Sequence, residues 1–195
     1  SSTSRGLGDV YKRQDTHSTS VSLVGGTLNA TGTLTMGSVV ESATTEAGSV
    51  GWTYDVSNSS VQYLAQGESA TQQFAVTVDD GHGGVVTQNV TVTVNGANDA
   101  PDATYTTTRY ATEGLSNITG QLTASDVDTT DTRTFQQVGT LAGLSISSSG
   151  AWTFNPTASE YNYLAEGQSV TVTGSYRVTD NFGATDVESF NIVVS

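Results

Sequence analysis

The sequence predicts an all-β fold made of two tandem β-sandwiches, and three observations lead to this fold class. The 195 residues are rich in Thr, Val, Ser and Gly, which favour strands and turns over long helices. Short runs alternate apolar and polar residues, as in Val85–Val94 (VVTQNVTVTV), a pattern typical of a strand with one buried and one solvated face. The third observation is an internal duplication.

Residues 51–94 align with residues 151–194 without a gap. Trp52-Thr53-Tyr54 matches Trp152-Thr153-Phe154, and both copies continue into the same Tyr-Leu-Ala-x-Gly-x-Ser run. Identities at one constant offset indicate a tandem duplication. A unit of roughly 100 residues is large enough to bury its own core without disulfides, which agrees with the absence of Cys.

The second copy carries the full set of expected elements. Its alternating runs predict about seven strands, the number typical of an immunoglobulin-like Greek-key sandwich of this size. Trp152 and its counterpart Trp52 are expected to anchor the two cores. The predicted strands cover residues 103–111, 118–124, 133–138, 141–147, 150–155, 169–179 and 185–194.

The first copy is expected to lack its first strand, because residues 1–14 stand where that strand should be and show no alternation. We interpret residues 1–14 as an unassigned segment, either a scar or a disordered arm. The first repeat then covers residues 15–97 and the second residues 98–195. Pro101 in the linker keeps the residue before it extended and helps to separate the repeats.

Charge and hydropathy exclude several classes of function. The chain has 19 acidic and 6 basic residues, and its formal net charge of -13 argues against binding to nucleic-acid phosphates. No apolar run is long enough to span a bilayer, so we expect no membrane insertion. Without Cys, thiolate metal sites are excluded as well.

Two stretches resemble a known family. Val76–Pro101 (VTVDDGHGGVVTQNVTVTVNGANDAP) resembles the end of a VCBS-type, bacterial cadherin-like repeat, and Ala111–Asp128 (ATEGLSNITGQLTASDVD) resembles the start of the next. The resemblance covers nearly all of residues 15–195. It implies cadherin-like, Ig-like modules in large secreted bacterial surface proteins, including RTX-type adhesins, with calcium at module junctions and a mainly architectural role.

Chain direction predicts where the acids of the second repeat gather. Strands of a seven-strand sandwich alternate up and down, so the loops at 125–132 and 180–184 lie at the end where the chain enters the repeat. Asp and Asn are common turn residues, but Ca²⁺ takes roughly six to eight oxygen ligands, and such a cluster can supply them. The resemblance favours calcium. The expected ligands are Asn98, Asp99, Asp126, Asp128, Asp180 and Glu68.

The same reasoning predicts half-sites elsewhere. Asp79 and Asp80, together with Asp15, lie at the matching end of the first repeat. Glu113, after the first strand of the second repeat, would face a following repeat. The Asp126–Asp131 loop is no EF-hand, because it lacks the Gly and the final acid that an EF-hand loop requires.

Catalysis is not expected. The duplication places Phe182 at the position of His82, which is typical of a turn-tip side chain and not of a general base. The sequence contains no nucleophile elbow, P-loop or H-E-x-x-H motif.

We therefore expect non-catalytic structural extender repeats of a secreted or cell-surface bacterial adhesin, stiffened by calcium between repeats and supporting adhesion or biofilm. The expected partners are neighbouring repeats of the same chain and, through other modules, cell-surface glycans or proteins. Two alternatives stay open: a carbohydrate- or protein-binding module, and an accessory β-sandwich region of a large secreted hydrolase.

Overall fold

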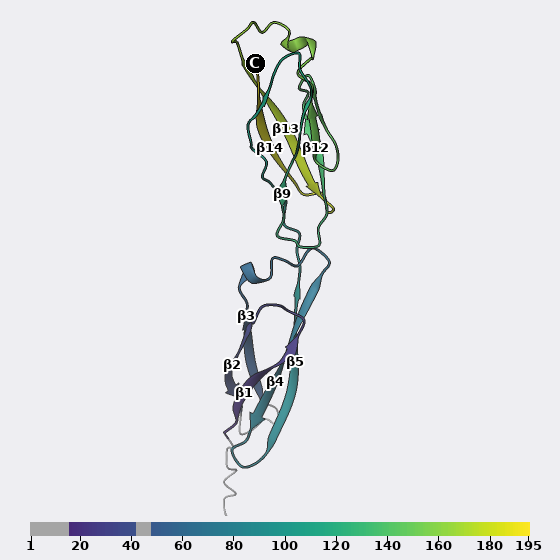
Figure 1. Cartoon of the computed structure of the whole chain (residues 1–195). Coiled ribbons are helices and arrows are strands. Elements are labelled where there is room, and N and C mark those ends of the chain that lie inside the picture. Colours follow the sequence, from purple (N-terminus) through teal and green to yellow (C-terminus); the bar gives the residue numbers. More distant parts are fainter. Residues whose placement is uncertain (1–15, 42–47) are drawn as a thin grey trace, which may run out of the picture. The chain divides into compact units, whose positions relative to one another are not determined.

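The computed structural model describes residues 16–41 and 48–195. Residues 1–14, expected to belong to neither repeat, and Asp15 lie outside the described residues. The chain divides into two compact units (Figure 1). Unit 1 takes the described residues of Ser1–Val61 and Ser69–Val94, and unit 2 takes Gln62–Glu68 and Asn95–Ser195. The all-β fold class is confirmed, since the described residues form strands and two single-turn 3₁₀ helices.

Unit 2 is a sandwich of a four-stranded and a three-stranded sheet, completed by one short strand pair. The strand orders are β10-β13-β14-β7, β11-β12-β8 and β6-β9. All pairs are antiparallel except β7 with β14, which is parallel. The elements are β6 (Asp102–Ala103), β7 (Arg109–Ala111), β8 (Ile118–Gln121), β9 (Ala124–Ser125), β10 (Arg133–Val138), β11 (Leu144–Ile146), β12 (Ala151–Phe154), η2 (Ser159–Tyr161), β13 (Val170–Asp180) and β14 (Thr185–Val194).

The predicted first strand of unit 2, residues 103–111, is divided between two partners. Its start, β6, pairs with β9, whereas its end, β7, pairs with β14 of the four-stranded sheet. The predicted second strand, residues 118–124, is divided in the same way into β8 and the start of β9. Alternation along the chain shows that a segment is extended but not that it changes partner midway.

Trp152 anchors the core of unit 2, as expected. Only 2% of its surface is exposed, and its ring lies 5.1 Å from that of Phe190 and 6.3 Å from that of Tyr105. The core around it combines residues from both sheets. Its buried members are Ala103, Ala111, Leu122, Leu144, Trp152, Phe154, Tyr161, Tyr176, Val178, Phe190, Ile192 and Val194.

Unit 1 contains fewer strands in its described part. Its sheets have the orders β1-β4-β5 and β2-β3, and β1 pairs with β4 as β10 pairs with β13. By this pairing, β1 to β5 correspond to β10 to β14. The elements are β1 (Ser18–Gly26), β2 (Thr33–Val40), β3 (Ser49–Asp55), η1 (Asn58–Ser60), β4 (Ser69–Asp79) and β5 (Val85–Asn95).

The described residues of unit 1 include no counterpart of β6, β7, β8 or β9, which is more than the single missing strand that we expected. Their buried core is small and consists of Leu34, Phe74 and Val76. The expectation that Trp52 anchors this core is wrong, because 48% of its surface is exposed. No strand of the described residues covers Trp52 as β8 covers Trp152.

Candidate metal centre

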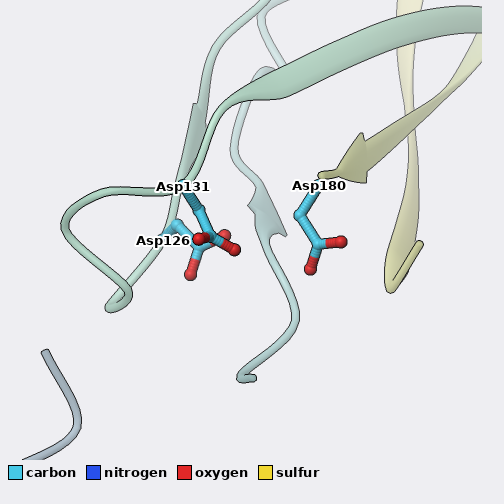
Figure 2. Close-up of side chains that lie close together, drawn as sticks. All are labelled: Asp126, Asp131 and Asp180. Atoms are coloured by element: carbon cyan, nitrogen blue, oxygen red, sulfur yellow. The ribbon is translucent and has the colours of Figure 1, made fainter. Parts of the chain in front are cut away.

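Three carboxyl groups converge in unit 2, those of Asp126, Asp131 and Asp180 (Figure 2). One carboxylate oxygen from each lies within 4.8 Å of the others. Asp126 and Asp131 belong to the loop between β9 and β10, and Asp180 is the last residue of β13. Because Arg133 of β10 pairs with Asp180 of β13, the sheet itself places this loop beside the end of β13.

The loop is shaped by its own hydrogen bonds. The Asp128 amide donates to Asp126 Oδ1 at 3.1 Å, and the Asp131 amide donates to the Asp128 carbonyl at 3.2 Å. The Thr132 amide donates to Asn181 Oδ1 at 2.8 Å, which connects the loop to the turn after β13. Such Asx-type bonds are what Asp and Asn supply in turns, and here they position three carboxylates in one place.

Two linker residues contact both loops. Asn98 Nδ2 donates to Asp180 Oδ2 and to the Asp99 carbonyl, each at 2.8 Å. The Asp99 amide donates to Asp128 Oδ2 at 2.8 Å. The segment that leads into unit 2 is therefore held at the acidic loops by side-chain hydrogen bonds.

Four side-chain oxygens at this place are buried and have no hydrogen-bond partner. They are Asn98 Oδ1, Asp126 Oδ2, Asp128 Oδ1 and Asp131 Oδ2. Asp128 is only 1% exposed, so water cannot readily solvate its free oxygen. Buried acceptors without partners are rare in native proteins, since each lost hydrogen bond is energetically costly. Asp126 and Asp131 also belong to the three converging acids, and a cation bound among these acids would interact with carboxylate oxygens that otherwise lack partners.

The charges are not balanced by basic residues, since no Lys or Arg of the described part forms an ion pair with these carboxylates. Burial, followed by the negative charges of Asp128, Asp126 and Asp180, raises the pKa of the Asp131 carboxyl, and a hydrogen bond from Asn181 offsets this only in part. Burial also acts to raise the pKa of Asp180. There it is outweighed by hydrogen bonds from Asn98 and from the turn amides, so the pKa of Asp180 is lowered.

The donor set consists of oxygen alone, which suits a hard cation. The converging carboxylates of Asp126, Asp131 and Asp180 offer several of the oxygens that Ca²⁺ requires, and carbonyls or water would complete the shell. Mg²⁺ usually retains several waters and uses one or two carboxylates, so a group of three carboxylates favours Ca²⁺.

The structure brings together most of the ligands expected from the sequence: Asn98, Asp126, Asp128 and Asp180, with Asp99 contributing its amide. Asp131 was missing from that set although it lies in the same loop, and its position two residues before the strand at 133–138 was the available signal. Glu68 Oε2 instead accepts from the Ala65 amide at 3.0 Å, and Glu68 is not one of the three converging acids.

The proposed half-site acids of unit 1 accept hydrogen bonds from their own turn. Asp79 Oδ1 accepts from the Gly81 amide at 2.7 Å, and Asp80 Oδ1 accepts from the amides of His82 and Gly84 at 2.7 and 2.8 Å. Asp180 Oδ1 receives the same two bonds from the residues two and four positions later. The duplicated turn is therefore preserved in both units.

The other two sequence-derived candidates lie at loop positions. The His82 side chain is at the tip of the β4–β5 turn, with Nδ1 2.8 Å from the Asp80 carbonyl oxygen. Glu113 donates its amide to the Ser195 carbonyl at 2.9 Å, beside the last residue of unit 2.

Comparison with known proteins agrees with this architecture. Residues 98–193 match the family model described as the bacterial Ig domain. The match lies entirely within unit 2 and supports the Ig-like fold of that unit. No curated protein matches the chain in sequence. The described part contains no helix long and apolar enough to cross a membrane.

The Ig-like repeat and the unit before it also resemble cadherin ectodomains in fold. PcdhgB3 EC1-4 superimposes with a TM-score of 0.53 at 10% identity, covering 92% of this chain and 41% of that chain. Human mucin-like protocadherin EC1-2 gives a TM-score of 0.51 at 17% identity and 84% coverage of both chains. The chain thus spans less than half of the first of these proteins, and the likeness concerns fold alone.

Proposed function

We propose that the chain is a pair of non-catalytic extender repeats from a secreted bacterial surface protein, and that calcium bound at the N-terminal end of unit 2 stiffens the connection between repeats. The parent protein would be an adhesin of the VCBS or RTX type. The bacterial Ig match and the cadherin-like fold support an architectural, extracellular role.

The observation that carries the proposal is the group of four buried oxygens without partners, together with three carboxylates within 4.8 Å. Without an ion, burial and then the repulsion between like charges raise the pKa of Asp131. With an ion, the repulsion becomes attraction. The site therefore stabilises the repeat only when it is filled, which is how a ligand that binds the folded state acts.

The stiffening follows from the origin of the ligands. Asn98 belongs to the linker, whereas Asp126, Asp128 and Asp131 belong to the β9–β10 loop and Asp180 to β13. An ion shared by these three segments would fix the linker to unit 2. A fixed linker restricts how the preceding repeat moves, and a tandem array of such repeats extends as a rod.

Isothermal titration of calcium into the chelator-treated full chain tests the proposal. We expect saturable binding that Asp128→Asn weakens strongly, because one buried ligand loses its charge. Glu166→Gln is the matched control, since Glu166 is exposed and lies in the turn before β13. Equal binding by all three proteins, or none by the parent chain, contradicts the proposal.

A further inference from the structure

One segment of unit 2 comes from the middle of the sequence of unit 1. Gln62–Glu68 belongs to unit 2, although Val61 before it and Ser69 after it belong to unit 1. The chain crosses between the units once more between Val94 and Asn95. Whatever holds Gln62–Glu68 on unit 2 therefore restrains unit 1 through two further covalent connections besides the linker.

This segment contains a turn that the second copy repeats. The Glu68 amide donates to the Ala65 carbonyl at 3.0 Å, and the Ala65 amide donates to Glu68 Oε2 at 3.0 Å. In the second copy, the Gln168 amide donates to the Ala165 carbonyl at 2.9 Å, and the Ala165 amide donates to Gln168 Oε1 at 3.0 Å. The two turns are alike, so differences between them come from their surroundings.

The surroundings of the two turns differ. Leu64 and Ala65 are 5% and 2% exposed, whereas Leu164 is only partly buried and Ala165 is exposed. A Cβ on Gly96 would meet the carbonyl oxygens of Leu64 and Ala65, so the linker backbone packs closely on this turn. The first turn is thus part of a packed surface of unit 2.

The acidic loop contacts the same segment. The Asp131 amide donates to the Asp128 carbonyl at 3.2 Å, which closes a β-turn with Thr129 at its second position. From there the Thr129 amide and Oγ1 donate to the Tyr63 carbonyl at 3.5 and 3.3 Å. Asp126 and Asp131, on either side of Thr129 in the chain, are two of the three converging acids. An ion at these acids would hold both sides of the turn that presents Thr129.

We propose that Thr129 couples the ion site to Gln62–Glu68, so that calcium at the acidic loop clamps this segment on unit 2. The inference rests on the proposed function and names the residue and the second segment through which the ion acts. In the ion-free chain, repulsion between the carboxylates of Asp126 and Asp131 loosens the loop, and the hydrogen bonds of Thr129 open more often. Bound calcium removes this repulsion, and Gln62–Glu68 opens less often.

Amide hydrogen exchange of the full chain, measured by NMR with calcium and with chelator, tests the coupling. We expect calcium to slow exchange at the Ala65 and Glu68 amides about two- to tenfold, the factor that one hydrogen bond of ordinary net strength supplies. The amides of Ala165 and Gln168 are the internal control, because they close the same turn away from the acidic loop. Calcium should leave their exchange nearly unchanged.

Thr129→Val removes the hydroxyl donor and keeps a side chain of similar size. This variant should still bind calcium in the isothermal titration, but should lose most of the calcium-induced slowing at Ala65 and Glu68. Thr130→Val is the matched control, since it makes the same change at the next loop position, which is also exposed. It should behave like the parent chain in both measurements.

Two results would overturn the coupling and leave the ion site in place. One is calcium binding in the titration without slower exchange at Ala65 and Glu68, and the other is equal slowing in the Thr129→Val chain. An equal slowing at Ala165 and Gln168 would overturn it as well, because calcium would then stabilise both turns alike. Absence of calcium binding by the parent chain contradicts the proposed function itself, and the coupling with it.

Discussion

Gly120 and Trp152 are cross-strand partners on β8 and β12, and the Trp152 ring takes the space that a side chain at position 120 would need. Gly120→Ala should destabilise unit 2 by about 1–3 kcal/mol through overpacking. Urea unfolding followed by Trp152 emission in a Trp52→Phe background measures the effect. Gly51→Ala is the control, because nothing lies within 4 Å of its added Cβ and unit 2 has Ala151 at that position.

Removing the charge of Asp131 should change the melting temperature of unit 2 in opposite directions without and with calcium. In the ion-free chain, Asp131→Asn relieves repulsion from Asp126, Asp128 and Asp180, so the melting temperature of unit 2 should rise. In saturating calcium the same variant should melt below the parent chain, because a ligand has lost its charge. Differential scanning calorimetry with chelator and with calcium gives both values. A variant that is less stable under both conditions would show that Asp131 has a merely structural role.

The raised pKa of Asp131 predicts a pH dependence that calcium reverses. An unfolded Asp titrates near 3.8, and a folded pKa above this value means that the folded state binds the proton more tightly. The stability of the ion-free unit 2 should therefore rise as the pH falls through that folded pKa towards 3.8. The lowered pKa of Asp180 acts oppositely, and its contribution is lost only below 3.8.

With calcium bound, the same acidification should destabilise unit 2, since protons compete with the ion for the carboxylates. Melting curves from pH 7 down to about pH 4, just above the unfolded pKa of Asp, with calcium and with chelator, check both directions. Asp131→Asn should reduce the rise in the ion-free chain. If the stability of the ion-free variant rises as much on acidification as that of the parent chain, other acidic groups cause the pH dependence.

Unit 1 should unfold before unit 2. The buried hydrophobic cluster of its described residues has three members, Leu34, Phe74 and Val76, and its strands β3 and β5 have a single partner there, whereas unit 2 buries a full aromatic core. Single-tryptophan variants, Trp52→Phe and Trp152→Phe, allow each unit to be followed separately in urea. Loss of the Trp152 signal at lower urea than the Trp52 signal would show that the small core and the singly paired strands do not limit stability.

The local sequence was sufficient to predict the bounds of strands in which apolar and polar residues alternate without a break. β10 and β14 occupy the predicted residues 133–138 and 185–194. It was not sufficient where a strand changes partner, as between β6 and β7, because pairing depends on segments far away in the chain. Trp52 and Trp152 show the same limit, since identical residues in aligned positions differ in burial when one neighbouring strand is absent from the described residues.

The candidate site was predicted in location but not in full composition. Chain direction placed the loop at 125–132 and the turn after residue 179 at one end of the repeat, and the register of β10 with β13 agrees with this. Which acids converge depends on side-chain direction within a turn. Asp131 joins the group, whereas Glu68 accepts a hydrogen bond within its own turn.

Small-angle scattering of the full chain, recorded in calcium and then in chelator, tests most directly whether an ion bound by the Asn98 linker and the acidic loops restricts inter-repeat motion. We expect a rod-like, narrow distance distribution in calcium and a flexible one in chelator. Asp128→Asn should give the flexible curve under both conditions, and Glu166→Gln should behave like the parent chain. Identical curves for the parent chain in calcium and chelator would contradict calcium stiffening.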